Sequence, residues 1–316
     1  FLLICRQAYG ISELGYLYAY ISGPIIGFIF SSILVNLQLS LIEQSGKEIG
    51  FIELFRESLP FAIDSTLAPI SESATRIILL VASGTVAVAI FEVAWKVFIG
   101  GSAIVRAIRK SMLSTYSSKK LDRDKMSASI YDSRKLIIWL APLGIVCGSF
   151  GSFLIPFVFS KDYMESIPVF VILLSTWAVM LVGSSQQVFV QALQHGNRFL
   201  VLTGIGTLIQ ISSAILLTEI FEARGASLSI LAGQLAMISI SIVLTWNSEY
   251  FIKLRLETIT SLILILVFVS LTPFLDMVSI SFDFIMCAII TSVLMIIIYK
   301  RMEGDSLFLL ARSNKF

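Results

Sequence analysis

Apolar segments of about 20 residues follow one another along nearly the whole chain, and this succession constrains the fold more than any other feature. A helix of about 20 mostly apolar residues can cross the roughly 30 Å hydrocarbon layer of a bilayer. Because lipid offers no hydrogen bonds, each segment must satisfy its own backbone as an α-helix. Charged residues make up only 14% of the 316 residues, against about 25% in soluble domains. The sequence therefore predicts an all-α, polytopic membrane protein.

Charged and turn-forming clusters divide the chain into about nine transmembrane spans. The predicted spans are 13–37, 59–82, 84–108, 136–159, 165–192, 199–219, 226–246, 258–275 and 282–299. The chain opens on Phe1 without a starting Met, and its first residues resemble the end of an earlier span. We therefore expect that an N-terminal part of the protein precedes this sequence.

The distribution of Lys and Arg predicts the orientation of these spans. Of the 23 basic residues, 18 fall in the loops after alternate spans and in the C-terminal tail, among them Arg109 in the loop after span 84–108. Cytoplasmic loops are enriched in Lys and Arg, so we expect a cytoplasmic C-terminus. The loops predicted on the outer side are short, which leaves no room for an external catalytic domain. They lie near 83–84, 160–164, 220–225 and 276–281.

Span 59–82 carries Asp64, Glu72 and Arg76 at depths where an ionised side chain costs about 2.5–3.5 kcal/mol. Such residues should face protein or water. Helical periodicity places all three on one polar face, together with Ala68, Ser71 and Thr75. The opposite face is mostly apolar and comprises Ile63, Leu67, Ile70, Ala74, Ile77, Ile78 and Val81.

Span 84–108 repeats the pattern with Glu92 and Lys96, and its polar stripe continues through Arg106. Only Gly84 and its neighbours separate the two spans, so they form a charged hairpin. A water-filled cavity lined by such residues suits a charged or highly hydrated cargo. The alternative is that the i, i+4 pairs Glu72–Arg76 and Glu92–Lys96 are structural and only cancel their own desolvation.

Several function classes lack their characteristic motifs. The sequence contains no GxxxxGK[ST], HExxH or GxSxG motif and no paired Cys motif. Its net charge of +2 gives no indication of nucleic-acid binding. His195, the one histidine, has no second His or acidic cluster beside it. We expect no cofactor, no metal and no enzymatic activity. Glutamines such as Gln187 and Gln210 suit either sugar hydroxyls or contacts between helices.

Four segments, taken in order, resemble a known family. FRESLPFAIDSTLAPISESATRIILLVASGTVAVAIFEVAWKVF is similar to its basic linker, "LP" helix start and "vG-Y-x-x-A-x-r" hairpin. FLIPFVFSKDYMESIPVFVILL is similar to "lfG-x-x-Y-x-x-a", QALQHGNRFLVLTGIG to "l-x-a-x-G-x-x-k", and FEARGASLSILAGQL to "fGi-x-GAa-x-a". The family is that of Wzx-like oligosaccharide-lipid flippases, in the polysaccharide transporter branch of the multidrug/oligosaccharidyl-lipid/polysaccharide exporter (MOP) superfamily. The chain departs from it at Ser160 and Ala87, where Gly is usual, and at Phe91, which replaces Tyr.

The resemblance implies the C-terminal part of a two-bundle transporter of about 12–14 helices. Residues 1–37 would end in the last helix of the N-terminal bundle, and 38–58 would be a cytoplasmic linker. Residues 59–246 would form the C-terminal six-helix bundle, and 247–316 two further helices with a cytoplasmic tail.

The resemblance also implies a function. The protein would translocate polyprenyl-diphosphate-linked oligosaccharide units across the cytoplasmic (inner) membrane for O-antigen, lipopolysaccharide or related surface polysaccharide biosynthesis. Arg76, Lys96 and Arg106 would bind the substrate, and Asp64, Glu72 and Glu92 would carry a coupling proton or sodium ion. Partners would include membrane lipid and polysaccharide assembly proteins, with no nucleic acid. The alternatives are a multidrug/cation antiporter of the same superfamily, a peptidoglycan-precursor flippase, and a membrane scaffold or glycan-assembly subunit.

Overall fold

The computed structural model describes residues 51–117, 150–193 and 196–246, with single residues at 140, 146, 263, 289 and 293. The described helices belong to one compact unit, 55–316, and only the first turn of α3 lies before it. The segment predicted at 1–37 lies outside the described residues, as does the part 38–50 of the predicted linker 38–58. Spans 258–275 and 282–299 also lie outside them, apart from those single positions. The C-terminal tail, and with it the predicted cytoplasmic C-terminus, also lies outside them.

Within the described residues, the structure is entirely helical. The elements are α3 (Phe51–Tyr116), α5 (Gly151–Phe159), the short 3₁₀ helix η1 (Lys161–Tyr163), α6 (Ser166–Leu193) and α7 (Gly196–Leu244). Helices α3, α6 and α7 are long and apolar enough to cross a membrane. The prediction of an all-α membrane fold is confirmed, and the predicted spans 59–82, 84–108, 165–192, 199–219 and 226–246 fall on these three helices.

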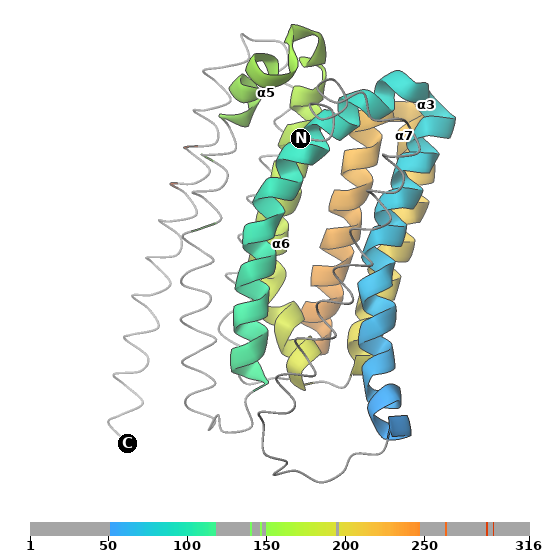
Figure 1. Ribbon diagram of the computed structural model, residues 1–316, viewed down its shortest axis with the longest axis vertical. Helices are drawn as coiled ribbons and strands as arrows, with labels where there is room; N and C mark the ends of the chain where they lie inside the picture. The colour runs from blue at the N-terminus through green and yellow to red at the C-terminus, as the bar shows by residue number, and fades with distance from the viewer. Residues whose placement is uncertain are drawn as a thin grey trace, which may run out of the picture. The chain divides into compact units, whose positions relative to one another are not determined.

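Helix α3 consists of two legs that double back on each other (Figure 1). The break is Gly84, whose backbone angles are φ 80° and ψ −175°. Residues with a Cβ rarely adopt a positive φ, whereas glycine adopts it without steric cost. The hairpin predicted from the sequence is therefore present, with its turn at the predicted glycine.

Two further turns also contain a residue with a positive φ, but that residue is not glycine. Helix α7 breaks at Glu222, with φ 50° and ψ −126°, and its two legs also lie side by side in Figure 1. Between α5 and η1, Ser160 has φ 98° and ψ 157°. These breaks coincide with the short outer loops predicted near 220–225 and 160–164. Each of the turns at Gly84, Ser160 and Glu222 thus contains one residue with a positive φ.

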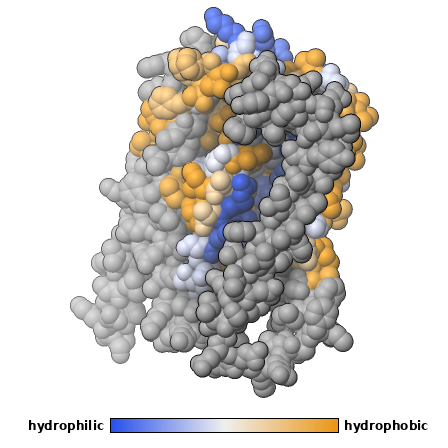
Figure 2. Space-filling model, viewed as in Figure 1, coloured by the Kyte–Doolittle hydropathy of each residue, from blue (hydrophilic) through white to orange (hydrophobic). Residues whose placement is uncertain are grey.

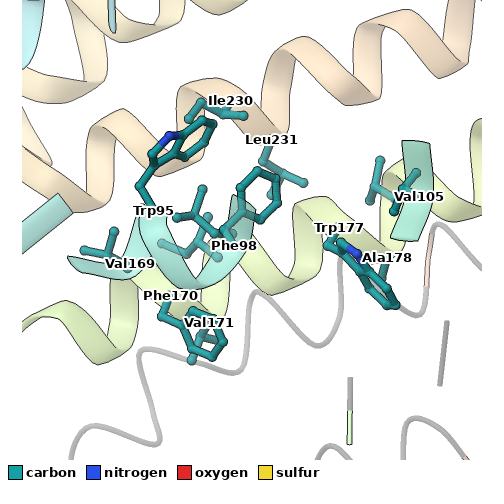
Figure 3. Packing of buried hydrophobic residues seen from close by; sticks show 14 of the residues in the cluster. Trp95, Phe98, Val105, Val169, Phe170, Val171, Trp177, Ala178, Ile230 and Leu231 are labelled. Atoms are coloured by element: carbon teal, nitrogen blue, oxygen red, sulfur yellow. The ribbon is translucent and has the colours of Figure 1, made fainter. Parts of the chain in front are cut away.

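Aromatic and branched side chains fill the space between α3, α6 and α7. Figure 3 shows Trp95 and Phe98 of α3 against Ile230 and Leu231 of α7, with residues of α6 beside them. Trp177 of α6 donates from Nε1 to the carbonyl of Gly101, at 2.8 Å, which ties α6 to the return leg of α3. The return leg of α3 is thereby fixed against both neighbours.

The first legs of α3 and α7 run in the same direction and are joined in register. Gln210 Nε2 donates to Thr75 Oγ1 at 3.2 Å, and Ser83 Oγ donates to the carbonyl of Thr218 at 3.2 Å. Both bonds join residues 135 positions apart in the sequence. Two contacts with the same offset require parallel helices, which agrees with the alternating orientation predicted from Lys and Arg.

Candidate functional site

A cavity of about 280 Å³ lies between the two legs of α3, α6 and α7. Its wall combines acidic, basic, aromatic and amide side chains. Those that carry its chemistry are Asp64, Glu72, Trp95, Ser102, Arg106, Arg109, Gln187, Thr203, Gln210 and Gln234. Figure 2 shows hydrophilic surface in the middle of one face of the molecule, with apolar surface beside it. A polar interior inside apolar helices is the arrangement predicted for a charged or hydrated cargo.

The first leg of α3 contributes the acidic side of the cavity. Asp64 and Glu72 both line it, with Ala68 and Ser71 between them on the same face. Leu67 was predicted on the opposite, apolar face, but it lines the cavity. The other residues of that face are exposed or half-buried on the outside of the helices, as the helical periodicity predicts. Its most exposed members are Ile70, Ile77 and Val81, at 55%, 61% and 82%.

The return leg of α3 contributes the basic side. Arg106 and Arg109 line the same cavity as the two acids. Their i, i+3 spacing places them on one side of the helix. Arg106 Nη1 donates to Ser102 Oγ at 2.9 Å, a contact that orients its guanidinium group. Arg106 was predicted as a site residue. Arg109 was predicted only as a cytoplasmic basic residue, although its spacing from Arg106 could have identified it.

Charged residues closer to the turn form an ion pair across the hairpin. Arg76 Nε lies 2.6 Å from Glu92 Oε1, and the Arg76 guanidinium lies 5.5 Å from the centre of the Trp95 ring. The sequence instead suggested intrahelical pairs, Glu72–Arg76 and Glu92–Lys96. Within the described part of the chain, the ion pair found is the one between the legs. A charged residue can pair with a residue on the neighbouring leg instead of with one at i, i+4 on its own leg. Periodicity along a single helix contains no information about such partners.

Three of the six predicted site residues line the cavity and three do not. Asp64, Glu72 and Arg106 lie in its wall. Arg76 and Glu92 pair with each other nearby, and Lys96 is exposed. Arg76, Glu92 and Lys96 are not among the residues that line the described cavity wall. The substrate and ion roles predicted for all six stay predictions.

Sequence reasoning did not identify Trp95 as a wall residue. The side chain is 4% exposed and lies in a row of aromatic rings, 5.6 Å from Phe91 and 4.9 Å from Phe98 between ring centres. A tryptophan in an apolar span is usually part of the core or of the membrane interface, and no spacing rule separates those positions from a cavity wall. The sequence left two interpretations of Gln187, binding to sugar hydroxyls or contacts between helices, and the structure places it in the cavity wall.

No protein-family model and no curated protein sequence matches this chain. A solved structure does match: the outward-facing conformation of a multidrug resistance MATE family transporter of the MOP superfamily. The TM-score is 0.57 with 16% sequence identity, over 76% of this chain. The chain spans 57% of the length of that transporter. At this identity the match shows the fold alone: the chain shares the helical membrane-protein fold of that structure.

Proposed function

We propose that this chain is part of a transporter that flips polyprenyl-diphosphate-linked oligosaccharide units across the cytoplasmic membrane for surface polysaccharide assembly. The observation that carries the proposal is the pair Arg106 and Arg109 in the wall of a cavity between membrane-length helices. Intramembrane charges are expensive, and they commonly mark the path of a charged substrate. Support for a transporter also comes from the fold shared with a MOP-superfamily member.

The chemistry of the arginine pair suits a diphosphate. A guanidinium group presents planar donors that bind phosphate oxygens bidentately, and it stays charged in all conditions of interest. Two such groups at i, i+3 on one helix match a cargo headgroup with two linked phosphates. The hydrogen bond from Arg106 to Ser102 reduces the side-chain freedom that binding would otherwise remove.

The acids on the opposite leg suit a coupling ion. Asp64 and Glu72 share the cavity with the arginines, so a proton or sodium ion bound there changes the charge that the phosphate meets. We propose that ion binding at these carboxylates is coupled to alternating access. Arg76 and Lys96 lie outside the described cavity wall. The phosphate contact is therefore expected first at Arg106 and Arg109.

A second candidate, export of organic cations, is favoured by one specific observation. Asp64 and Glu72 lie in the same wall as Phe98, and carboxylates beside an aromatic ring suit a flat organic cation. The structural match is itself described as a multidrug resistance transporter. The two candidates differ in the sign of the cargo charge, which makes them separable.

Reconstitution of the full-length protein in proteoliposomes tests the proposal. The substrates are a fluorescent short-chain polyprenyl diphosphate carrying an oligosaccharide, scored by leaflet accessibility, and ethidium, scored by uptake. We expect movement of the glycolipid, and loss of at least about tenfold in rate for Arg106→Gln with Arg109→Gln. Lys161→Gln, which changes an exposed lysine in η1, is the matched control and should leave the rate unchanged. Ethidium transport without glycolipid movement would favour the second candidate and overturn the first.

A further inference from the structure

Two hydrogen-bond donors in the cavity wall are buried and have no partner among the described residues. They are Nε1 of Trp95 and Nε2 of Gln187, on α3 and α6. The side chains are 4% and 1% exposed. Both residues line the cavity that contains Arg106 and Arg109. Buried polar groups in folded proteins are nearly always hydrogen-bonded, so an orphaned pair in one cavity indicates what the cavity binds.

The surroundings of Trp95 restrict how it can contact a ligand. Phe91 stacks on its ring with an interplanar angle of 18°, and Phe98 lies tilted at 35°. The Arg76 guanidinium lies over the ring at 5.5 Å. Figure 3 shows the indole nitrogen edge beside Ile230, away from the chain of α3. Because neighbouring groups occupy the ring faces, the N–H edge is the part of the indole left for a ligand.

Two other donors in the cavity wall already have partners that explain them. Gln210 donates to Thr75, and Arg106 donates to Ser102. These contacts hold helices and side chains in place. The donors of Trp95 and Gln187 make no such contact among the described residues, although both side chains are buried. They are therefore placed to bind an acceptor that enters the cavity.

A neutral N–H donor selects a different ligand atom from a guanidinium. Phosphate oxygens carry charge and pair best with arginine, whereas hydroxyl, ether and amide carbonyl oxygens are neutral acceptors that suit an indole or amide N–H. We infer that Trp95 and Gln187 form a neutral subsite for the sugar part of the cargo, separate from the diphosphate contact at Arg106 and Arg109. This inference rests on the proposed function and names the part of the cargo that each set of donors recognises.

The subsite is tested by comparing two lipids on the full-length protein purified in detergent. One is a radiolabelled polyprenyl diphosphate carrying an N-acetylated disaccharide, and the other is the same polyprenyl diphosphate without sugar. We expect Trp95→Phe and Gln187→Leu each to weaken binding of the glycosylated lipid about tenfold, the effect of one lost hydrogen bond in a dry site. Binding of the sugar-free lipid should stay within about twofold.

Matched controls separate a subsite from a general packing effect. Gln191→Leu changes a glutamine one turn further along α6, and Trp246→Phe changes an exposed tryptophan beyond the end of α7. Both should leave the two affinities unchanged. Each variant is first checked for a single symmetric elution peak, and where Trp95→Phe fails this check, Gln187→Leu and Gln187→Glu carry the comparison.

The possible results have distinct meanings. Equal weakening for both lipids, or no weakening for the glycosylated lipid, overturns the neutral subsite. Arg106→Gln should weaken both lipids alike, because the diphosphate is common to them. A wild-type protein that binds neither lipid overturns the proposed function together with the subsite. One that binds both lipids, but with no loss in the Trp95 and Gln187 variants, overturns the subsite alone.

Discussion

Arg76 Nε lies 2.6 Å from Glu92 Oε1, and the two residues lie equally far along the chain from Gly84 on opposite legs of α3. In an antiparallel hairpin, residues at equal distances from the turn reach the same depth. The ion pair therefore joins residues at the same depth on the two legs and defines the register of the hairpin. Both side chains are about a third exposed, at 31% and 32%, so water screens the pair in part.

Neutralising both members of this pair should destabilise the protein by less than the sum of the two single effects. We expect Arg76→Gln or Glu92→Gln to cost about 1–2 kcal/mol, because each leaves a half-buried charge without its partner. The double variant should cost less than the sum, with a coupling of at least about 0.5 kcal/mol. Thermal unfolding of the full-length protein in detergent measures these differences. Strict additivity of the two single effects would show that the contact contributes nothing.

The hairpin register also shows what the sequence could and could not predict. Gly84 was identified as the turn because glycine interrupts two apolar runs, and the polar face of the first leg followed from helical periodicity. The Arg76–Glu92 pair did not follow, because periodicity ranks partners on one helix and contains no information about the neighbouring leg. For the same reason Arg109 was assigned to a cytoplasmic loop, whereas α3 continues to Tyr116 and carries it into the cavity wall.

A comparison of two glycines of α3 isolates the effect of backbone strain, because an added Cβ would crowd no neighbour at either position. A Cβ added at Gly84 or at Gly100 would meet nothing within 4 Å, but only Gly84 of the two has a positive φ, 80°. Gly84→Ala should therefore cost about 1–3 kcal/mol through strain alone. Gly100→Ala should be neutral or stabilise by up to about 1 kcal/mol, because alanine favours the helix. Unfolding midpoints measured in parallel check the pair, and equal effects would contradict the turn geometry.

The buried amide of Gln210 depends on the hydroxyl of Thr75. Thr75→Val keeps the shape of the side chain but removes the acceptor that lies 3.2 Å from Gln210 Nε2. Both residues are buried, at 0% and 3% exposure, so the amide would lose a partner that water does not replace. We expect a loss of about 1–3 kcal/mol. The double variant Thr75→Val with Gln210→Leu should recover part of that loss, since no donor is then left unpaired.

A comparison with the neighbouring contact gives the control for this prediction. Ser83 also bonds to α7, at the carbonyl of Thr218, but it is only part-buried. Ser83→Ala should cost less than Thr75→Val, because water can reach the carbonyl that it frees. The reverse order would show that the two helices are held mainly near the turn.

The non-glycine turns at Ser160 and Glu222 offer a gain in stability. Ser160 has φ 98° and Glu222 has φ 50°, a backbone region that glycine adopts without steric cost. Both side chains are exposed, so replacing them removes little packing.

Glycine relieves strain of about 1–3 kcal/mol at such a residue, and its greater freedom in the unfolded chain offsets about 0.5–1 kcal/mol of that. Ser160→Gly also removes the hydroxyl that donates to Asp162 Oδ2 at 3.1 Å and accepts from the Asp162 amide at 3.5 Å, two exposed contacts for which water can substitute. We expect each variant to raise the unfolding midpoint in detergent and the double variant to add the two gains, because the turns lie in different hairpins. Lowered midpoints for both would show that these residues do not hold a positive φ in the folded protein.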